Sequence, residues 1–170
     1  MLDRSLTYFL TSIAEDGIGA ANAIFEKRLG WSVRDIRVLR LVRADPGMTF
    51  TRLAEQTKLE RTLTSRILTR LIRAGLIART NSTVDARVFT LRLTEDGEVL
   101  CAQADPLTRE LETLMLEPLS ANERAVFFGM VERVKNWVQG GYAQEVADRY
   151  PEARGADGRK RRVADVTAAE

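Results

Sequence analysis

Basic residues gather in one segment of this chain of 170 residues. Between residues 58 and 92 there are eight basic and two acidic residues, so the segment carries a net charge of +6 and the remainder carries −4. The basic residues are Lys58, Arg61, Arg66, Arg70, Arg73, Arg79, Arg87 and Arg92. A basic patch on an otherwise acidic chain is the electrostatic pattern of a surface that binds nucleic acid. Three or four of these residues taken alone would indicate only a solvated face.

The residue types that most enzymes need for catalysis are scarce. The chain has no histidine and a single cysteine, Cys101. A tetrahedral zinc site, a Ser–His or Cys–His nucleophile pair and a histidine general base are therefore excluded. The sequence also has no Gly-rich phosphate loop and no nucleotide-binding fingerprint. We expect no enzymatic activity, no cofactor and no bound metal.

The composition is that of a soluble globular domain, with 45% apolar and 29% charged residues. The first four residues, MLDR, do not begin a secretory signal, and no apolar run is long enough to span a membrane. The lone cysteine cannot form an internal disulfide, which agrees with a reducing compartment. We therefore expect a cytoplasmic protein.

The segment ERTLTSRILTRLIRAGLI, residues 60–77, predicts an amphipathic helix that ends at Gly75. At 100° per residue its apolar sector contains Leu63, Thr64, Ile67, Leu68 and Leu71, and Arg70 lies at the edge of the polar side. Arginine can bind guanine through two hydrogen bonds, and short hydroxyls bind phosphates or bases. The candidate DNA-binding residues of this helix are Arg61, Thr62, Ser65, Arg66, Thr69, Arg70 and Arg73.

Two neighbouring elements would position this helix. The segment TFTRLAEQTKL predicts a short helix with threonine caps, buried through Leu53 and Ala54, and two helices joined by a tight turn indicate a helix-turn-helix. After it, IARTN and RVFTLRL bracket a polar loop. In the second run, Phe89, Leu91 and Leu93 alternate with polar neighbours, which predicts a β-hairpin with one face on the core.

Longer helices flank this unit on both sides. Apolar spacing predicts one helix over residues 2–30 and a second that begins at Ser32-x-x-Asp35 and ends at the turn Asp45-Pro46-Gly47. Thr94 is expected to cap a helix that runs toward Met115 and ends at Pro118. Ser120-x-x-Glu123 matches a capping box, which would open a last long helix that ends near Gly140. The predicted fold is mostly α with a small β-hairpin wing: a winged helix-turn-helix flanked by long terminal helices.

Two motifs of the sequence resemble the MarR family of bacterial transcriptional regulators. Asp85-x-Arg87, followed by Leu93-Thr94 and Gly97, resembles the family's wing signature, and LAEQTKLERTLTSRILTRLIRAGLIAR resembles its helix-turn-helix. The resemblance covers about residues 6–139. It implies a sequence-specific DNA-binding regulator, most often a repressor, that binds a palindromic operator in double-stranded DNA as a homodimer.

The resemblance assigns roles to the parts of the chain. It implies an N-terminal dimerisation helix over residues 1–30, a DNA-binding domain over 31–93 and C-terminal dimerisation helices over 94–150. The alternative is that the apolar stripes of the terminal helices form the core of one monomer. Residues 151–170 contain few large apolar residues and mixed charge, which predicts a disordered tail.

The resemblance also implies that Arg87 lies at the wing tip and enters a minor groove, where Asp85 would pair with its guanidinium and orient it. A narrow minor groove concentrates negative potential and attracts arginine. The alternative is an ordinary hairpin ion pair that contributes little.

Finally, the resemblance implies release from DNA by a small aromatic or phenolic effector, with Phe25, Arg28, Trp31 and Arg43 near its cleft. Trp31 is also consistent with plain core packing, because aromatic residues at helix junctions usually pack. We expect no redox role for Cys101, because no nearby cation would lower the pKa of its thiol. A different class of function stays open: a DNA-architectural or protein-interaction module that uses the winged fold without operator specificity.

Overall fold

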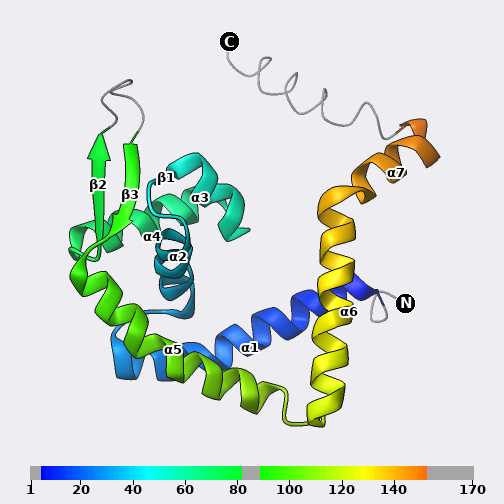
Figure 1. Cartoon of the computed structure of the whole chain (residues 1–170), viewed down its shortest axis with the longest axis horizontal. Coiled ribbons are helices and arrows are strands. Elements are labelled where there is room, and N and C mark those ends of the chain that lie inside the picture. The colour runs from blue at the N-terminus through cyan, green and yellow to red at the C-terminus, as the bar shows by residue number, and fades with distance from the viewer. Residues whose placement is uncertain (1–4, 82–88, 153–170) are drawn as a thin grey trace, which may run out of the picture. The chain divides into compact units, whose positions relative to one another are not determined.

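The computed structural model of this chain describes residues 5–81 and 89–152. Its fold is mostly helical with one small antiparallel sheet, which confirms the predicted fold class (Figure 1). The described elements are α1 (Leu6–Leu29), α2 (Val33–Ala44), β1 (Met48–Thr49), α3 (Phe50–Thr57), α4 (Arg61–Arg73), β2 (Ile77–Asn81), β3 (Phe89–Leu93), α5 (Glu95–Met115), α6 (Ala121–Gly140) and α7 (Tyr142–Arg149). None of the described helices combines the length and apolar character that crossing a bilayer requires.

The chain divides into two compact units, Met1–Met115 and Leu116–Glu170. In the first unit α2 is the central helix, because α1, α3, α4, α5 and β3 all contact it. Its apolar face supplies Ile36, Val38, Leu39 and Val42 to the core, and each of these side chains is at most 1% exposed. The first half of α5 adds Leu100, Ala104 and Leu107 to the same core. The division into DNA-binding and dimerisation segments stays a prediction.

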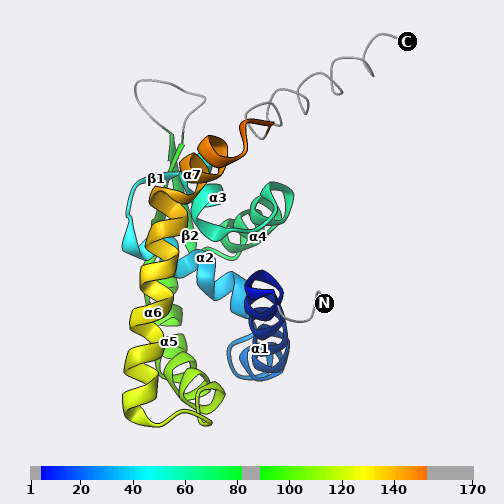
Figure 2. The ribbon, with the colours of Figure 1, turned by 90° about the vertical axis from the view of Figure 1, so that its right-hand side faces the viewer.

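The sheet of the first unit has three strands in the order β1–β3–β2, and both pairings are antiparallel. β2 and β3 form the predicted hairpin, with Ile77 opposite Leu93. β1, in which Met48 pairs with Leu91, was not predicted, because two residues are too short to show an alternating pattern. In two perpendicular views, α3 and α4 lie side by side next to the sheet (Figure 1, Figure 2).

The capping residues expected from the sequence are confirmed. Ser32 and Asp35 form a capping box at the start of α2, and Ser120 and Glu123 form another at the start of α6. α4 is followed by Gly75, whose φ of 74° lies in the left-handed region that favours glycine. These signals depend on contacts between near neighbours in the chain, and for this reason they could be recognised in the sequence.

The second unit consists of α6 and α7, which contact one another. The last predicted helix ends near Gly140, where α6 does end, but α7 was not predicted. Large apolar side chains of α6 are exposed, namely Val126, Phe127, Phe128, Met130, Val131, Val134, Trp137 and Val138. The predicted disordered tail lies outside the described residues, except for Pro151 and Glu152.

Candidate nucleic-acid interface

The helix α4 presents two chemically different faces, as the helical wheel predicts. Thr64, Ile67, Leu68 and Leu71 are buried, and Leu63 is half-buried. All of the candidate DNA-binding residues on this helix are exposed, namely Arg61, Thr62, Ser65, Arg66, Thr69, Arg70 and Arg73. The exposed face therefore offers guanidinium groups and short hydroxyls, with no acidic side chain between residues 61 and 73.

Two buried threonines fix the angle between α3 and α4. The hydroxyl of Thr57 donates to the carbonyl of Ala54 at 3.1 Å, and that of Thr64 donates to the carbonyl of Glu60 at 3.1 Å. The two hydroxyl oxygens lie 3.1 Å apart, and because each hydroxyl has one proton, one of them can donate to the other in place of its own carbonyl. Sequence reasoning placed Thr64 in the apolar sector, and the structure shows how its buried oxygen is satisfied. Between the helices Lys58 has a φ of 56°, in the left-handed region, which makes the turn tight.

Aromatic rings hold two of the basic side chains. The guanidinium of Arg61 lies 4.8 Å from the ring centroid of Phe50, and that of Arg79 lies 4.0 Å from the ring centroid of Phe89. Such contacts restrict the rotamers of a long side chain before it binds a ligand. Arg79, which is exposed on β2, belongs to the basic segment but was not among the candidate DNA-binding residues. Phe89, opposite Asn81 in the hairpin, is the sequence signal that could have identified it.

Arg70 differs from the other basic residues of α4. Its Nη2 donates to Oδ1 of Asp35, a carboxylate at the start of α2 that is 1% exposed. Its guanidinium lies 5.8 Å from the ring centroid of Trp31. Sequence reasoning gave Arg70 a place on the edge of the DNA-facing sector, but it could not find a partner 35 residues away.

The base of the wing is joined to α4 by residues of the predicted wing signature. The Thr94 hydroxyl donates to the carbonyl of Gly75 at 2.6 Å, and its amide donates to the carbonyl of Leu76 at 3.1 Å. The amide of Gly97 donates to the Thr94 hydroxyl at 3.1 Å, which caps α5 as the sequence predicts. Asp85 and Arg87, the predicted wing-tip pair, lie outside the described residues.

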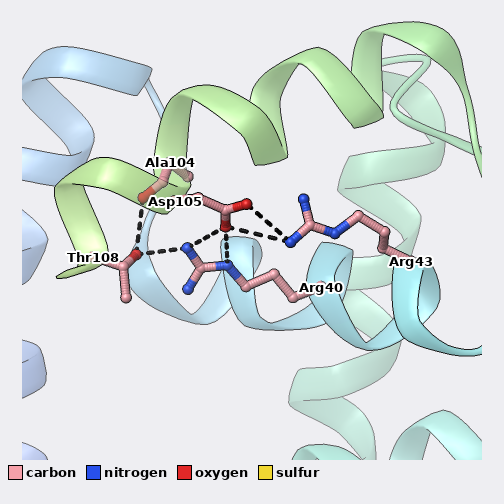
Figure 3. A network of polar contacts seen from close by, with 5 residues as sticks. All are labelled: Arg40, Arg43, Ala104, Asp105 and Thr108. Carbon is pink, nitrogen blue, oxygen red and sulfur yellow. Dashed lines mark hydrogen bonds and ion pairs between the residues drawn. The ribbon is translucent and has the colours of Figure 1, made fainter.

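A polar network joins α2 to α5 behind this surface (Figure 3). Asp105 accepts hydrogen bonds from Nε and Nη2 of Arg40, at 3.0 and 2.8 Å, and from Nη2 of Arg43 at 3.0 Å. Nη2 of Arg40 also donates to the Thr108 hydroxyl at 2.7 Å. Burial raises the pKa of Asp105, but the hydrogen bonds from Arg43 and Arg40 outweigh it, so the pKa lies below its ordinary value.

Cys101 lies next to this network and is fully buried. Burial raises the pKa of its thiol, and the nearby charge of Arg43 only partly opposes that rise. The expectation that no cation lies near Cys101 is therefore wrong, because Arg43 approaches it from α2, a helix distant in sequence. The inference that its thiol is not activated is unaffected, since the balance of the two effects favours the neutral thiol.

A cavity of about 660 Å³ lies between α1, α2 and α5. Most of its lining is apolar, and its polar side chains are Arg37, Arg40, Thr108 and Glu112. Of the residues expected near an effector cleft, Phe25 lines this cavity, whereas Arg28, Trp31 and Arg43 do not. Arg28 is exposed at the end of α1, and Arg43 is bound to Asp105. Trp31 packs against the core, as the plain packing alternative expects.

Comparisons with known proteins agree with this arrangement. The model of the MarR family matches residues 31–89. An HTH-type transcriptional repressor of Mycobacterium bovis is 26% identical over 106 residues, which cover 62% of this chain and 76% of that protein.

Two solved structures have a similar fold. A crystal structure of MarR superposes with a TM-score of 0.71 at 21% identity, covering 78% of this chain and 96% of that one. A mutant MarR from Escherichia coli, complexed with operator DNA, superposes with a TM-score of 0.67 at 22% identity, covering 76% and 92%. At this level of identity the two likenesses concern the fold alone.

Proposed function

This chain belongs to the MarR family of transcriptional regulators, and we propose that it represses transcription as a homodimer bound to a palindromic operator. The observation that carries the proposal is the exposed face of α4, which offers arginines and short hydroxyls without a carboxylate between residues 61 and 73. A helix with such a face fits a major groove, where base edges can be distinguished. The operator DNA bound by the similar E. coli MarR mutant supports the same use of the fold.

We assign the residues of this surface to two roles. Arg66 and Ser65, near the middle of the exposed face, would contact base edges, since an arginine there can reach guanine with two hydrogen bonds. Arg61 lies in the first turn of α4 and Arg73 in the last, and these would contact phosphates. Asp85 and Arg87 would extend the contact into a minor groove, as the resemblance implies.

The apolar surface of the terminal helices supports the proposed homodimer. In α1 the side chains of Leu6, Phe9 and Ile13 are 48–59% exposed. α6, in the other unit, has further exposed apolar side chains, and exposed apolar surface of this extent is typical of a protein interface. A two-fold partner would cover these faces and would place two copies of α4 on one palindrome.

An effector would fit the cavity between α1, α2 and α5. Its volume suits a small aromatic compound, and the cation of Arg37 would favour an acid. Phe25 is the one residue of the expected cleft that lines it. The alternative function, a DNA-architectural or interaction module, would need no such ligand and no base contacts.

The two functions differ in their sequence preference. We would select duplexes from a random library with the full chain and measure binding of the enriched duplex and a scrambled duplex of equal length, at one salt concentration. A regulator should bind the enriched duplex at least about 10³-fold more tightly. Its enriched motif should have two-fold symmetry, with half-sites about 10 bp apart. Equal affinity for both duplexes would support the architectural module instead.

A further inference from the structure

The side chain of Asp35 uses both of its carboxylate oxygens inside the protein. Oδ2 accepts from the amide of Ser32 at 2.9 Å and from its hydroxyl at 2.6 Å, which completes the capping box of α2. Oδ1 accepts from Nη2 of Arg70 in α4. A buried carboxylate is tolerated when its oxygens are paired, and Arg70 supplies the charge that balances it.

This ion pair joins α4 to the start of α2, where a separate hydrogen bond joins α2 to α1. Arg70 comes from α4, Ser32 and Asp35 begin α2, and the amide of Val33 donates to Oδ1 of Asn22 in α1 at 3.0 Å. The bond from Nη2 of Arg70 ends on a buried carboxylate that Ser32 also anchors, so it constrains the helix that carries Arg70. The axial rotation of α4 decides which of its side chains point outward.

The charge of Arg70 is also neutralised where it stands. Although its side chain is 57% exposed, one of its amino groups points to a carboxylate that is 1% exposed. An arginine paired in this way has no free charge with which to neutralise a DNA phosphate and release the counterion of that phosphate. The other exposed arginines of α4, such as Arg66, have no such buried partner among the described residues.

We propose that Arg70 is a positioning residue: its pair with Asp35 sets the orientation of the recognition helix against the start of α2, and Arg70 neutralises no phosphate. This replaces the expectation that Arg70 contacts DNA, and it rests on the proposed function. If Arg70 positions the helix, its removal should reduce the preference for the enriched duplex. If Arg70 contacts a phosphate, its removal should lower the affinity for all DNA sequences equally.

The test measures the affinity of Arg70→Ala and Asp35→Asn for the enriched and scrambled duplexes over a range of salt concentrations. A stoichiometric titration gives the active fraction of each variant, so that partial unfolding does not count as weak binding. We expect both variants to bind the enriched duplex at least about 10-fold more weakly, with affinity for scrambled DNA within about 2-fold of wild type. The slope of log affinity against log salt should not change in Arg70→Ala, because the paired guanidinium neutralises no phosphate.

Asp35→Asn is informative because its two expected effects have opposite signs. Removal of an acidic side chain near DNA would by itself tighten binding, whereas loss of the positioning role weakens binding to the enriched duplex. Arg70→Lys should recover part of the preference, since lysine keeps the charge but not the planar fork. If Asp35→Asn does not fold, Arg70→Ala and Arg70→Lys decide the question through the salt slope.

Two results separate this proposal from the one on which it rests. If wild type does not prefer the enriched duplex, the proposed function fails. If wild type prefers it, but Arg70→Ala weakens both duplexes equally and lowers the slope by about 0.9, Arg70 is a phosphate contact and the positioning role is refuted.

Discussion

Gly97 occupies a position in α5 where the backbone leaves no room for a side chain. A Cβ atom built there would lie 2.2 Å from the carbonyl oxygen of Leu76, 3.2 Å from its carbonyl carbon and 3.4 Å from Cβ of Leu93. The nearest of these atoms belongs to the backbone, which cannot rotate away as a flexible side chain can. The same oxygen accepts the hydrogen bond from the amide of Thr94, at 3.1 Å, that joins the wing to α4.

We therefore predict that Gly97→Ala destabilises the first unit, although alanine normally favours a helix. To reach an ordinary contact, which begins at 3.4 Å, the Cβ and the Leu76 oxygen must separate by about 1 Å. Overpacking of this kind costs about 1–3 kcal/mol, and weakening of the Thr94 hydrogen bond adds about 0.5–1.5 kcal/mol. The higher helix propensity of alanine offsets about 0.5–1 kcal/mol of this loss. The net loss should be about 1–3 kcal/mol in the free energy of unfolding.

Thermal unfolding followed by circular dichroism measures this change, at one protein concentration for all variants. Gly19→Ala is the matched control, because Gly19 also lies inside a helix of the first unit and a Cβ there meets nothing within 4 Å. Gly97→Ala should lower the melting temperature by at least about 4 °C, and Gly19→Ala should leave it unchanged or raise it. Equal or higher stability of Gly97→Ala would refute the reasoning, since the approach to Leu76 would then not constrain the chain.

Two further predictions concern the network between α2 and α5. Asp105→Asn should lower the free energy of unfolding by about 1–2 kcal/mol at pH 7, because the wild-type pKa is lowered and its charge is stabilised by Arg40 and Arg43. This contribution is present above the unfolded pKa of about 3.9 and is lost as the pH falls through the lower folded pKa. Urea titrations from pH 7 to about pH 2 should therefore show the two proteins converging below about pH 4, and a difference that does not shrink there would exclude Asp105 as its source. Cys101 should react with a thiol reagent at pH 8 far more slowly in the native protein than in guanidinium, since burial raises the pKa of its thiol, and similar rates would show that the site is open.

The sequence predicts those parts of the fold that depend on residues close together in the chain. Capping pairs such as Ser32 and Asp35 lie within one turn of helix, and the buried sector of α4 follows from its period. The same reasoning identified the exposed face of α4 on which the proposed function rests. Local spacing carries this information because hydrogen bonds at helix ends and burial along a helix are both short-range in sequence.

Contacts between distant segments could not be predicted in this way. Arg70 bonds to a residue 35 positions away, and Arg40 bonds to Asp105 across 65 positions. A helical wheel gives the face of a side chain but not its partner, so Arg70 was grouped with the DNA-facing residues. β1 was missed because its two residues pair only through β3.

Sequence-specific repression requires that the outer face of α4 distinguishes one DNA sequence from another. Binding of Arg66→Ala to the enriched and scrambled duplexes, at one salt concentration, tests this claim directly. Arg109→Ala is the matched control, because it removes the same charge from an exposed position of α5 in the same unit. We predict that Arg66→Ala weakens binding to the enriched duplex by about 1–3 kcal/mol and narrows the preference over scrambled DNA, while Arg109→Ala preserves the preference. An equal loss on both duplexes, or no loss on either, would contradict the claim that this face distinguishes base sequence.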